Sequence, residues 1–443
     1  MSGYVLTPLA RADIFDINTL QVAGIGDVGM STGVEPQLYD FEPRFGLAYR
    51  VNSKTVVRTG YGLSHFVGAT GFTGGTLSTQ FPVIYNIQSG TAGDYRVAGT
   101  LNSIPAVPVV QIPGSGILSP APDQAYFYIP SHNPMPAVHS FNFTIERELG
   151  WGIVLDVGYV GDIDRDLPEG LGLNTAAPGG GAAGRALYQK FGRTANTIER
   201  AYAASSSYNS LQTNLKKRFA HGLMFTAAYT YSKAMGYGGD VAGGGQIGFQ
   251  NNINLKTQYA PLSYDQTHVF VASQVYELPV GKGKKLLNRG GPLSYVLGNW
   301  QLNGILTLAT GTPFTVTADA TSCNCPGNSQ VADALRPATI LGGVGPGQHW
   351  FETSAFGQPG PNRFGTSGLN TVRGPGRRSY DFSLFKNFAV TERAKLEFRT
   401  EFYNLTNTPV FGNPAAFLNA GNFGQISSAS NSRTIQFGMR MVF

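Results

Sequence analysis

The sequence contains little charge, few cysteines and no long apolar segment. Only 13% of its 443 residues are Asp, Glu, Lys or Arg, about half the fraction usual in soluble domains. No run of about 18 apolar residues occurs, so helices are not expected to span a membrane. Glycine is abundant at 58 residues, and aromatic residues reach 12%. This composition is typical of a membrane β-barrel, with a large secreted β-protein as the alternative.

Two cysteines, Cys323 and Cys325, are too few to cross-link a chain of this length. Because only one residue separates them, we expect a local disulfide at a loop tip in an oxidising compartment. A metal site is the alternative, but it needs further ligands, and none lie nearby in the sequence.

The sequence lacks the motifs of enzymes and of metal centres. Its six histidines are scattered, and no nucleophile elbow, phosphate-binding loop or dinucleotide fingerprint occurs. Asp162, Asp164 and Asp166 have the spacing of the first calcium ligands of an EF-hand loop, but Leu167 replaces the required glycine. We predict an acidic loop end, with calcium as the alternative, and expect no enzyme activity and no cofactor.

The excess of positive charge is small. Lys and Arg number 32 against 26 Asp and Glu, and this net charge of +6 does not indicate nucleic-acid binding. The densest basic group lies in a glycine-rich turn and consists of Lys282, Lys284, Lys285 and Arg289. We expect a solvated turn there, with contact to an anionic lipid or partner surface as the alternative.

Apolar residues recur at every second position in eleven segments, which predicts eleven β-strands. A strand of about 11 residues tilted by ~40° climbs roughly 25 Å, the height of the apolar band of a membrane barrel. The segments are residues 44–51, 57–63, 141–146, 153–159, 211–219, 223–231, 268–278, 300–316, 380–388, 395–402 and 434–443.

One predicted strand shows the two faces clearly. Its charged residues share one side and its apolar residues the other, as expected for a wet lumen and a lipid surface. The charged residues are Lys395, Glu397, Arg399 and Glu401. Aromatic residues near strand ends fit interfacial girdles, with a stacking platform for sugars as the alternative: Phe66, Trp151, Phe219, Trp300 and Phe388.

Short and long connections alternate along the chain. A barrel with short periplasmic turns and long external loops has this pattern, whereas a soluble sandwich has no reason for it. The turn at 279–297 is of medium length and occupies a short-turn position. The long connections, rich in Gly, Pro, Asn and Ser, are residues 67–137, 162–207, 233–265, 320–378 and 405–432.

The odd number of strands indicates that the predicted sheet is incomplete. Bacterial single-chain barrels have even strand numbers. Residues 1–40 are poorly patterned and are expected to form an external loop or one strand, and residues 1–8 lack the features of a signal peptide. We therefore expect a fragment of a longer protein, with the remaining strands upstream.

Several segments resemble the C-terminal barrel of TonB-dependent outer-membrane receptors, and the Oar-like group most closely. The likeness covers residues 41–443 and includes the terminal strand. Its motifs are residues 41–50, 208–212, 228–233, 299–304, 310–314 and 398–407.

The resemblance implies about half of a ~22-stranded barrel, in the outer membrane of a Gram-negative bacterium and acting as a monomer. It implies that the barrel-assembly machinery reads the terminal strand, with Phe437 and Phe443 as key residues. Contact with TonB would require an N-terminal plug that is not recognisable here. The expected function is binding and import of a bulky ligand, which the loop composition does not identify. An outer-membrane structural or adhesion protein is the alternative.

Overall fold

The structure is a computed structural model, and it describes most of the chain. Most of residues 1–40, 67–137 and 233–265, for which loops were expected, lies outside the described residues. Three short strands there, β1 (Tyr4–Leu6), β2 (Val22–Gly24) and β5 (Ile117–Leu118), form a small sheet. The described residues are 4–6, 20, 22–24, 40–66, 117–118, 121–128, 130, 134–237, 255–289, 291–389 and 394–443.

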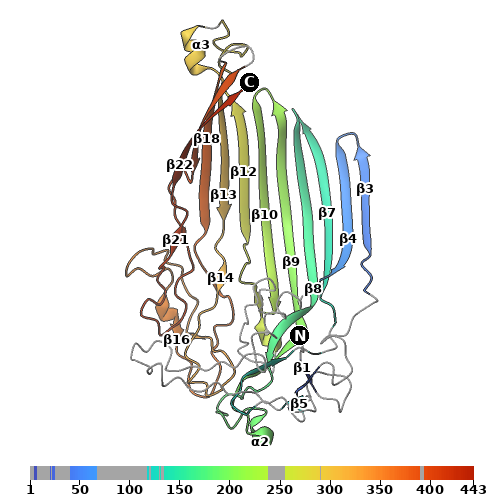
Figure 1. Ribbon diagram of the computed structural model, residues 1–443, viewed down its shortest axis with the longest axis vertical. Coiled ribbons are helices and arrows are strands. Elements are labelled where there is room, and N and C mark those ends of the chain that lie inside the picture. The colour runs from blue at the N-terminus through green and yellow to red at the C-terminus, as the bar shows by residue number, and fades with distance from the viewer. Residues whose placement is uncertain are drawn as a thin grey trace.

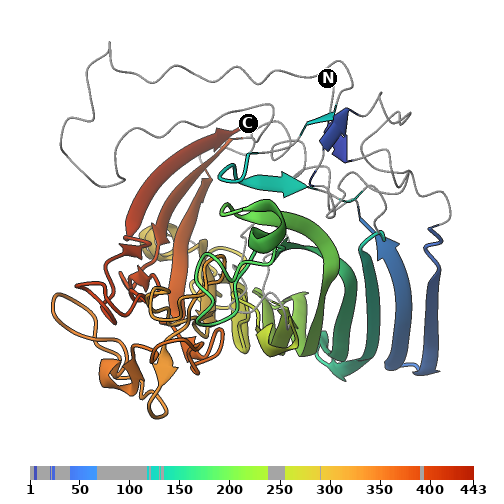
Figure 2. The ribbon, with the colours of Figure 1, turned by 90° about the horizontal axis from the view of Figure 1, so that it is seen from below.

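A single large antiparallel sheet dominates the molecule, which confirms the all-β prediction (Figures 1 and 2). Eleven strands lie side by side in chain order, and β6 (Tyr126–Tyr128) and β11 (Tyr259–Pro261) pair with β9 and β10. The eleven are β3 (Arg44–Asn52), β4 (Thr55–His65), β7 (Ala137–Gly150), β8 (Ile153–Gly172), β9 (Thr197–Ala220), β10 (Leu223–Tyr237), β12 (His268–Glu277), β13 (Trp300–Ala309), β18 (Arg377–Ala389), β19 (Lys395–Tyr403) and β22 (Thr434–Val442).

The pairing register sorts the side chains into an apolar face and a polar face. Phe382 pairs with Phe402, which pairs with Ile435, so apolar residues form rows across the sheet. Phe437 and Met439, both 70% exposed, belong to this apolar face. A slip of one residue would move every apolar side chain of a strand to the polar face, so the two-residue period fixes the register.

All connections at one end of the sheet are short or medium, and the long ones gather at the other end (Figure 1). The short-turn end carries α3 (Pro292–Leu297), and the long-loop end carries α2 (Tyr188–Phe191). This arrangement agrees with the predicted alternation. No helix in the described part of the chain is long and apolar enough to cross a membrane.

Two predicted boundaries at the long-loop end are wrong. β8 and β9 pair as far as Gly172 and Ile198, so the loop between them spans residues 173–196 and is shorter than the predicted loop at 162–207. Register shifts near Asp164 and Leu167 break the alternation that the prediction relied on. The strand predicted at 300–316 ends at Ala309, and the chain then leaves the sheet.

The connection from β13 to β18 and that from β19 to β22 fold together into a compact unit. We call residues 310–376 and 404–433 the loop cap. Phe351 is fully buried at its centre, and its ring lies 5.8 Å from that of Phe314 and 5.4 Å from that of Phe423. The cluster around it consists of Phe314, Val316, Ala318, Ala332, Ala355, Phe356 and Val372.

Short strand pairs and one close backbone contact give the loop cap its shape. A Cβ atom on Gly311 would collide with the carbonyl oxygen of Gly374, so only glycine fits where the chain enters the cap. The strand pairs are β14 (Pro313–Phe314) with β17 (Val372–Arg373), β15 (Asp333–Ala334) with β16 (Phe356–Gly357), and β20 (Val410–Phe411) with β21 (Ala429–Ser430).

We predict that Phe351→Ala unfolds the loop cap and leaves the sheet intact. Replacing a fully buried phenylalanine by alanine lowers the free energy of unfolding by about 3–5 kcal/mol, which is a large share of the total stability of a unit of this size. Limited proteolysis should cut the variant within residues 310–376. The shift in electrophoretic mobility of the protein on heating, which reports on the folded sheet, should be unchanged. Ile340→Ala, at a side chain 46% exposed, is the matched control and should behave like the parent. Equal protease resistance of the two variants would contradict the prediction.

Candidate functional site

Ion pairs cross the polar face from strand to strand. The guanidinium of Arg58 on β4 lies 2.7 Å from the Glu146 carboxylate on β7. Glu146 is the register partner of Asp156 on β8, and Asp156 accepts from Lys216 of β9 at 3.2 Å. The row therefore carries two cations at its outer positions and two carboxylates between them, so the face is charged and hydrated there without a net charge.

The predicted charged ladder of β19 lies on the same face. Its members are partly or fully exposed, and Arg399 pairs with Glu397. The Arg399 guanidinium also lies 4.8 Å from the ring centre of Phe385 on the neighbouring β18. Glu397 is thus paired along its own strand, whereas Glu401 accepts a hydrogen bond from the hydroxyl of Tyr403 at 3.3 Å.

A pocket of about 360 Å³ opens on the polar face between β12, β13, β18 and β19. Within it the amide of Asn303 donates to Ser383 at 3.1 Å. Most of the exposed lining of the pocket is apolar, and Val275, Ile305 and Phe385 contribute to it. Carboxylate, hydroxyl and amide groups also line it, a mixture suited to a molecule with apolar surface and a few hydrogen-bonding groups. The residues with these polar groups are Ser273, Asn303, Asp381, Ser383, Glu401 and Tyr403.

The calcium candidates do not form a metal site. Asp162, Asp164 and Asp166 lie inside β8, so the predicted acidic loop end is wrong. Asp164 accepts a hydrogen bond from Ser206, and Asp166 occupies a bulge with a φ of 53°. In the residues that the structure describes, no three His, Cys, Asp or Glu side chains gather as metal ligands would. Asp162 and Asp164 lie in the paired part of β8 and Asp166 lies in the bulge, and the three carboxylates do not form a group of ligands.

Cys323 and Cys325 form a disulfide in the loop cap, and both are almost fully buried. The segment around them, residues 321–328, docks against the loop between β8 and β9. Its carbonyl groups at Cys323, Asn324 and Pro326 accept hydrogen bonds of 2.9, 2.8 and 3.0 Å from the amides of Gly179, Gly181 and Ala176. Residues 321–328, the cysteine hook, therefore join two loops that are far apart in sequence.

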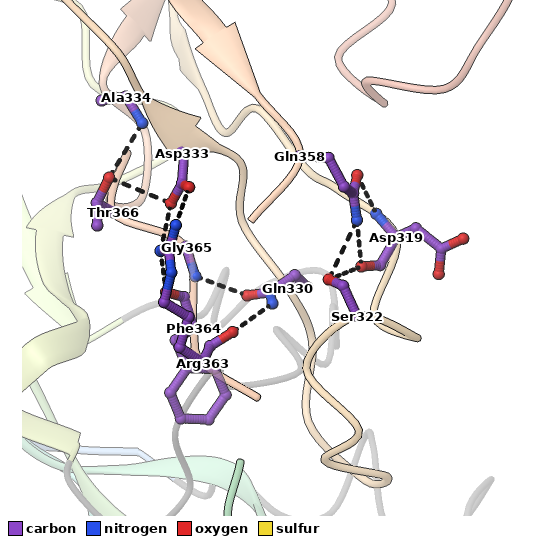
Figure 3. A network of polar contacts seen from close by, with 10 residues as sticks. All are labelled: Asp319, Ser322, Gln330, Asp333, Ala334, Gln358, Arg363, Phe364, Gly365 and Thr366. Carbon is purple, nitrogen blue, oxygen red and sulfur yellow. Dashed lines mark hydrogen bonds and ion pairs between the residues drawn. The ribbon is translucent and has the colours of Figure 1, made fainter. Parts of the chain in front are cut away.

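A polar network stiffens the loop cap beside the cysteine hook (Figure 3). Arg363 pairs with Asp333, and its backbone carbonyl accepts from Gln330 at 3.0 Å. Gln358 bridges to the backbone of Asp319 at 2.9 Å and to Ser322 at 3.2 Å. The hydrogen bond from Arg363 holds the pKa of the Asp333 carboxyl below its usual value.

A second ion pair attaches the loop cap to the sheet. Arg373 pairs with Asp265, which is 1% exposed and accepts from the amide of Ala234 on β10 at 2.7 Å. Arg373 also donates to the carbonyl of Gly311 at 3.1 Å. The sequence offered no signal for these contacts, because their partners lie up to 108 residues away.

Aromatic residues mark both ends of the apolar face. At the long-loop end, the hydroxyl of Tyr61 lies 2.9 Å from the His139 ring, and that of Tyr229 lies 2.8 Å from the His268 ring. At the short-turn end, Trp151 is 91% exposed. Aromatic residues at both ends of strands are typical of a barrel whose interfaces lie on either side of a bilayer. Of the residues predicted for the girdles, Trp300 and Phe388 pack against Lys386, and the girdles themselves stay a prediction.

We predict that acid loosens the loop cap through Asp333. Because the pKa of this carboxyl is lowered in the folded chain, its contribution to stability is complete above the unfolded value of about 3.9. That contribution is lost as the pH falls from the pKa of the unfolded chain through the lower pKa that Asp333 has in the folded chain. Pepsin should therefore cleave the parent cap faster as the pH drops below about 4. In Asp333→Asn the cap should be cleaved faster already at higher pH, with a shallower dependence on pH. Parallel pH profiles for parent and variant would contradict this assignment.

Several solved structures are similar to this chain. P. aeruginosa FpvA bound to a heterologous pyoverdine is 11% identical with a TM-score of 0.41, over 95% of this chain and 34% of FpvA. The outer membrane transporter YddB from Escherichia coli is 8% identical with a TM-score of 0.49, over 90% of this chain and 40% of YddB. BauA, the ferric preacinetobactin receptor from Acinetobacter baumannii, is 10% identical with a TM-score of 0.41, over 90% of this chain and 36% of BauA. The chain spans well under half the length of these proteins.

One protein family matches nearly the whole sequence. No curated protein matches the chain. The family model described as an outer membrane beta barrel domain, however, covers residues 8–436. The apolar and polar faces, the aromatic residues at strand ends and the one-sided loops are the features that such a barrel needs. The protein is located in the outer membrane of Gram-negative bacteria, and the chain belongs to the outer membrane beta barrel domain family.

Proposed function

We propose that this chain forms part of the barrel of a TonB-dependent receptor of the Oar-like type, which binds a bulky ligand and imports it. The motifs at residues 208–212, 228–233 and 398–407 support this family assignment. The observation that carries the function is the folded loop cap at the entrance to a polar, ion-paired sheet face. A purely structural barrel needs neither a cap with its own core nor a pocketed polar face.

In this proposal the loop cap captures the ligand and the polar face guides it inward. The cap is rigid, because its core, its ion pairs and the cysteine hook hold it to the sheet and to the loop between β8 and β9. A rigid cap can present a fixed binding surface with little loss of conformational entropy on binding. The hydrated polar face offers exchangeable hydrogen bonds, so a ligand can move along it without being trapped.

Within the described residues, β3 and β22 each have a neighbouring strand on one side only. An unpaired strand edge is costly in lipid, so we propose that other strands of the full-length protein close the barrel as a monomer. We also propose that the barrel-assembly machinery reads the terminal strand through Phe437 and Phe443, which are 70% and 90% exposed.

The test compares three strains of the native host: parent, a deletion of this gene and a deletion of TonB. Depletion of peptides, oligosaccharides and metal chelates from the medium is measured by mass spectrometry. We expect one set of compounds to persist in both deletion strains. Normal depletion by the gene-deletion strain, with a defect in surface adhesion alone, would overturn import and favour the structural or adhesion alternative.

We predict that the cysteine hook orders the loop between β8 and β9. The ring closed by Cys323 and Cys325 is short, so its loss should cost only about 1–2 kcal/mol through the unfolded chain. The double variant Cys323→Ser and Cys325→Ser should nevertheless release the carbonyls that bind Gly179 and Gly181. Hydrogen exchange should become faster at those two amides.

The amides of the paired strands β12 and β13 are the internal control for this variant and should exchange as in the parent. Unchanged exchange at both Gly179 and Gly181 would show that the hook is held without the disulfide.

A further inference from the structure

The medium turn at the short-turn end places a helix on the lipid side of the sheet. Lys386 of β18 belongs to the apolar face, because its register partners are Trp300 and Phe398, and Phe398 pairs with Met439. The ammonium group of Lys386 donates to the carbonyls at the end of α3, at 2.9, 3.0 and 2.7 Å for Tyr295, Val296 and Gly298. The helix is therefore fixed over the apolar face and away from the lumen.

Further contacts lock α3 in this position. The Tyr295 ring lies 5.7 Å from that of Phe388, and the indole of Trp300 donates to the carbonyl of Val296 at 3.1 Å. Lys386 is only 3% exposed and lies 4.9 and 4.8 Å from the ring centres of Trp300 and Phe388. Hydrogen bonds and rings thus surround its charge, although the residue stands in an apolar row.

The outer surface of α3 is apolar and exposed. Leu293, Tyr295, Val296 and Leu297 are 65%, 58%, 59% and 49% exposed, and Ser294 is the buried residue of this helix. Leu286 and Leu287, in the same turn, are 58% and 41% exposed. A surface of this kind in water would favour association, whereas in the interfacial region of a bilayer it buries its apolar area.

The charge of the turn fits the same location. Residues 278–299 contain four basic residues and no acidic residue. Lys284 is paired with Glu277 at 2.7 Å, while Lys282, Lys285 and Arg289 are exposed. Basic residues beside an interfacial helix attract anionic lipid headgroups.

We propose that the turn at 279–299 is an interfacial lipid anchor in the periplasmic leaflet. α3 inserts its apolar side chains between the phospholipids, and Lys282, Lys285 and Arg289 contact their anionic headgroups. Continuity with the apolar face favours lipid over a protein occupant, because a domain filling the lumen would lie on the opposite face. The proposal rests on the outer-membrane location and does not depend on import.

Spin labelling of Val296→Cys tests the insertion, because the native cysteines are paired and do not react with a thiol-directed nitroxide. The protein is extracted from the outer membrane and reconstituted in vesicles of phosphatidylethanolamine and phosphatidylglycerol, with folding checked by electrophoretic mobility. Leu341→Cys in the loop cap is the aqueous control, and Met439→Cys is the lipid control; both sites are at least 60% exposed.

We expect collisions of the Val296 label with oxygen to exceed those with a water-soluble nickel complex several-fold, as for Met439. Accessibility like that of Leu341 would overturn the proposal, because the helix would then lie in water. Protection from both reagents would also overturn it, because a protein segment or a second copy would then cover the helix.

A second variant tests the headgroup contacts. The combined changes Lys282→Glu, Lys285→Glu and Arg289→Glu leave α3 and its contacts to Lys386 in place. We expect the oxygen preference of the Val296 label to fall in this background, as it should in vesicles that lack phosphatidylglycerol. An unchanged preference in both experiments would overturn the assigned role of the basic residues.

Discussion

The backbone hydrogen bonds of the sheet determine the rest of this structure. In lipid, an unpaired amide or carbonyl group costs several kcal/mol, so each strand must pair along its length. The eleven long strands meet this need by lying beside their chain neighbours in an antiparallel order. Once pairing is complete, side chains only select the face that each residue occupies. A simple two-residue period is then enough to specify a very large sheet.

The loop cap is stabilised in a different way. Side chains of the sheet face lipid or water and contribute little to a protein core, whereas the cluster of buried apolar residues around Phe351 lies in the cap. Hydrophobic burial in water holds this unit together, as in a small soluble domain. Arg373 and Asp265 connect the two parts at a buried ion pair. The cap can therefore change in sequence without disturbing the pairing of the strands.

The sequence predicted the parts of the fold that depend on local order. All eleven strands and the side of the long loops follow from alternation and from turn composition. The boundaries near Asp166 were wrong, because a bulge with a φ of 53° interrupts the alternation there. The loop cap could not be predicted, because residues such as Phe351 and Phe423 meet only through the fold. The alternation predicted the polar face of the sheet. It could not predict the pocket on this face, because the lining residues come from four strands.

Lys386 shows how one residue can explain an element that alternation does not predict. In β18 it stands in a row with Tyr380, Phe382, Leu384 and Phe388, where a free ammonium group would face lipid. A helix of six residues such as α3 is too short to be stable alone. The ammonium group satisfies the free carbonyls at the helix end, and those carbonyls in turn remove the cost of its charge. Each therefore requires the other, which is why the one medium turn of the short-turn end is helical and lies against the apolar face.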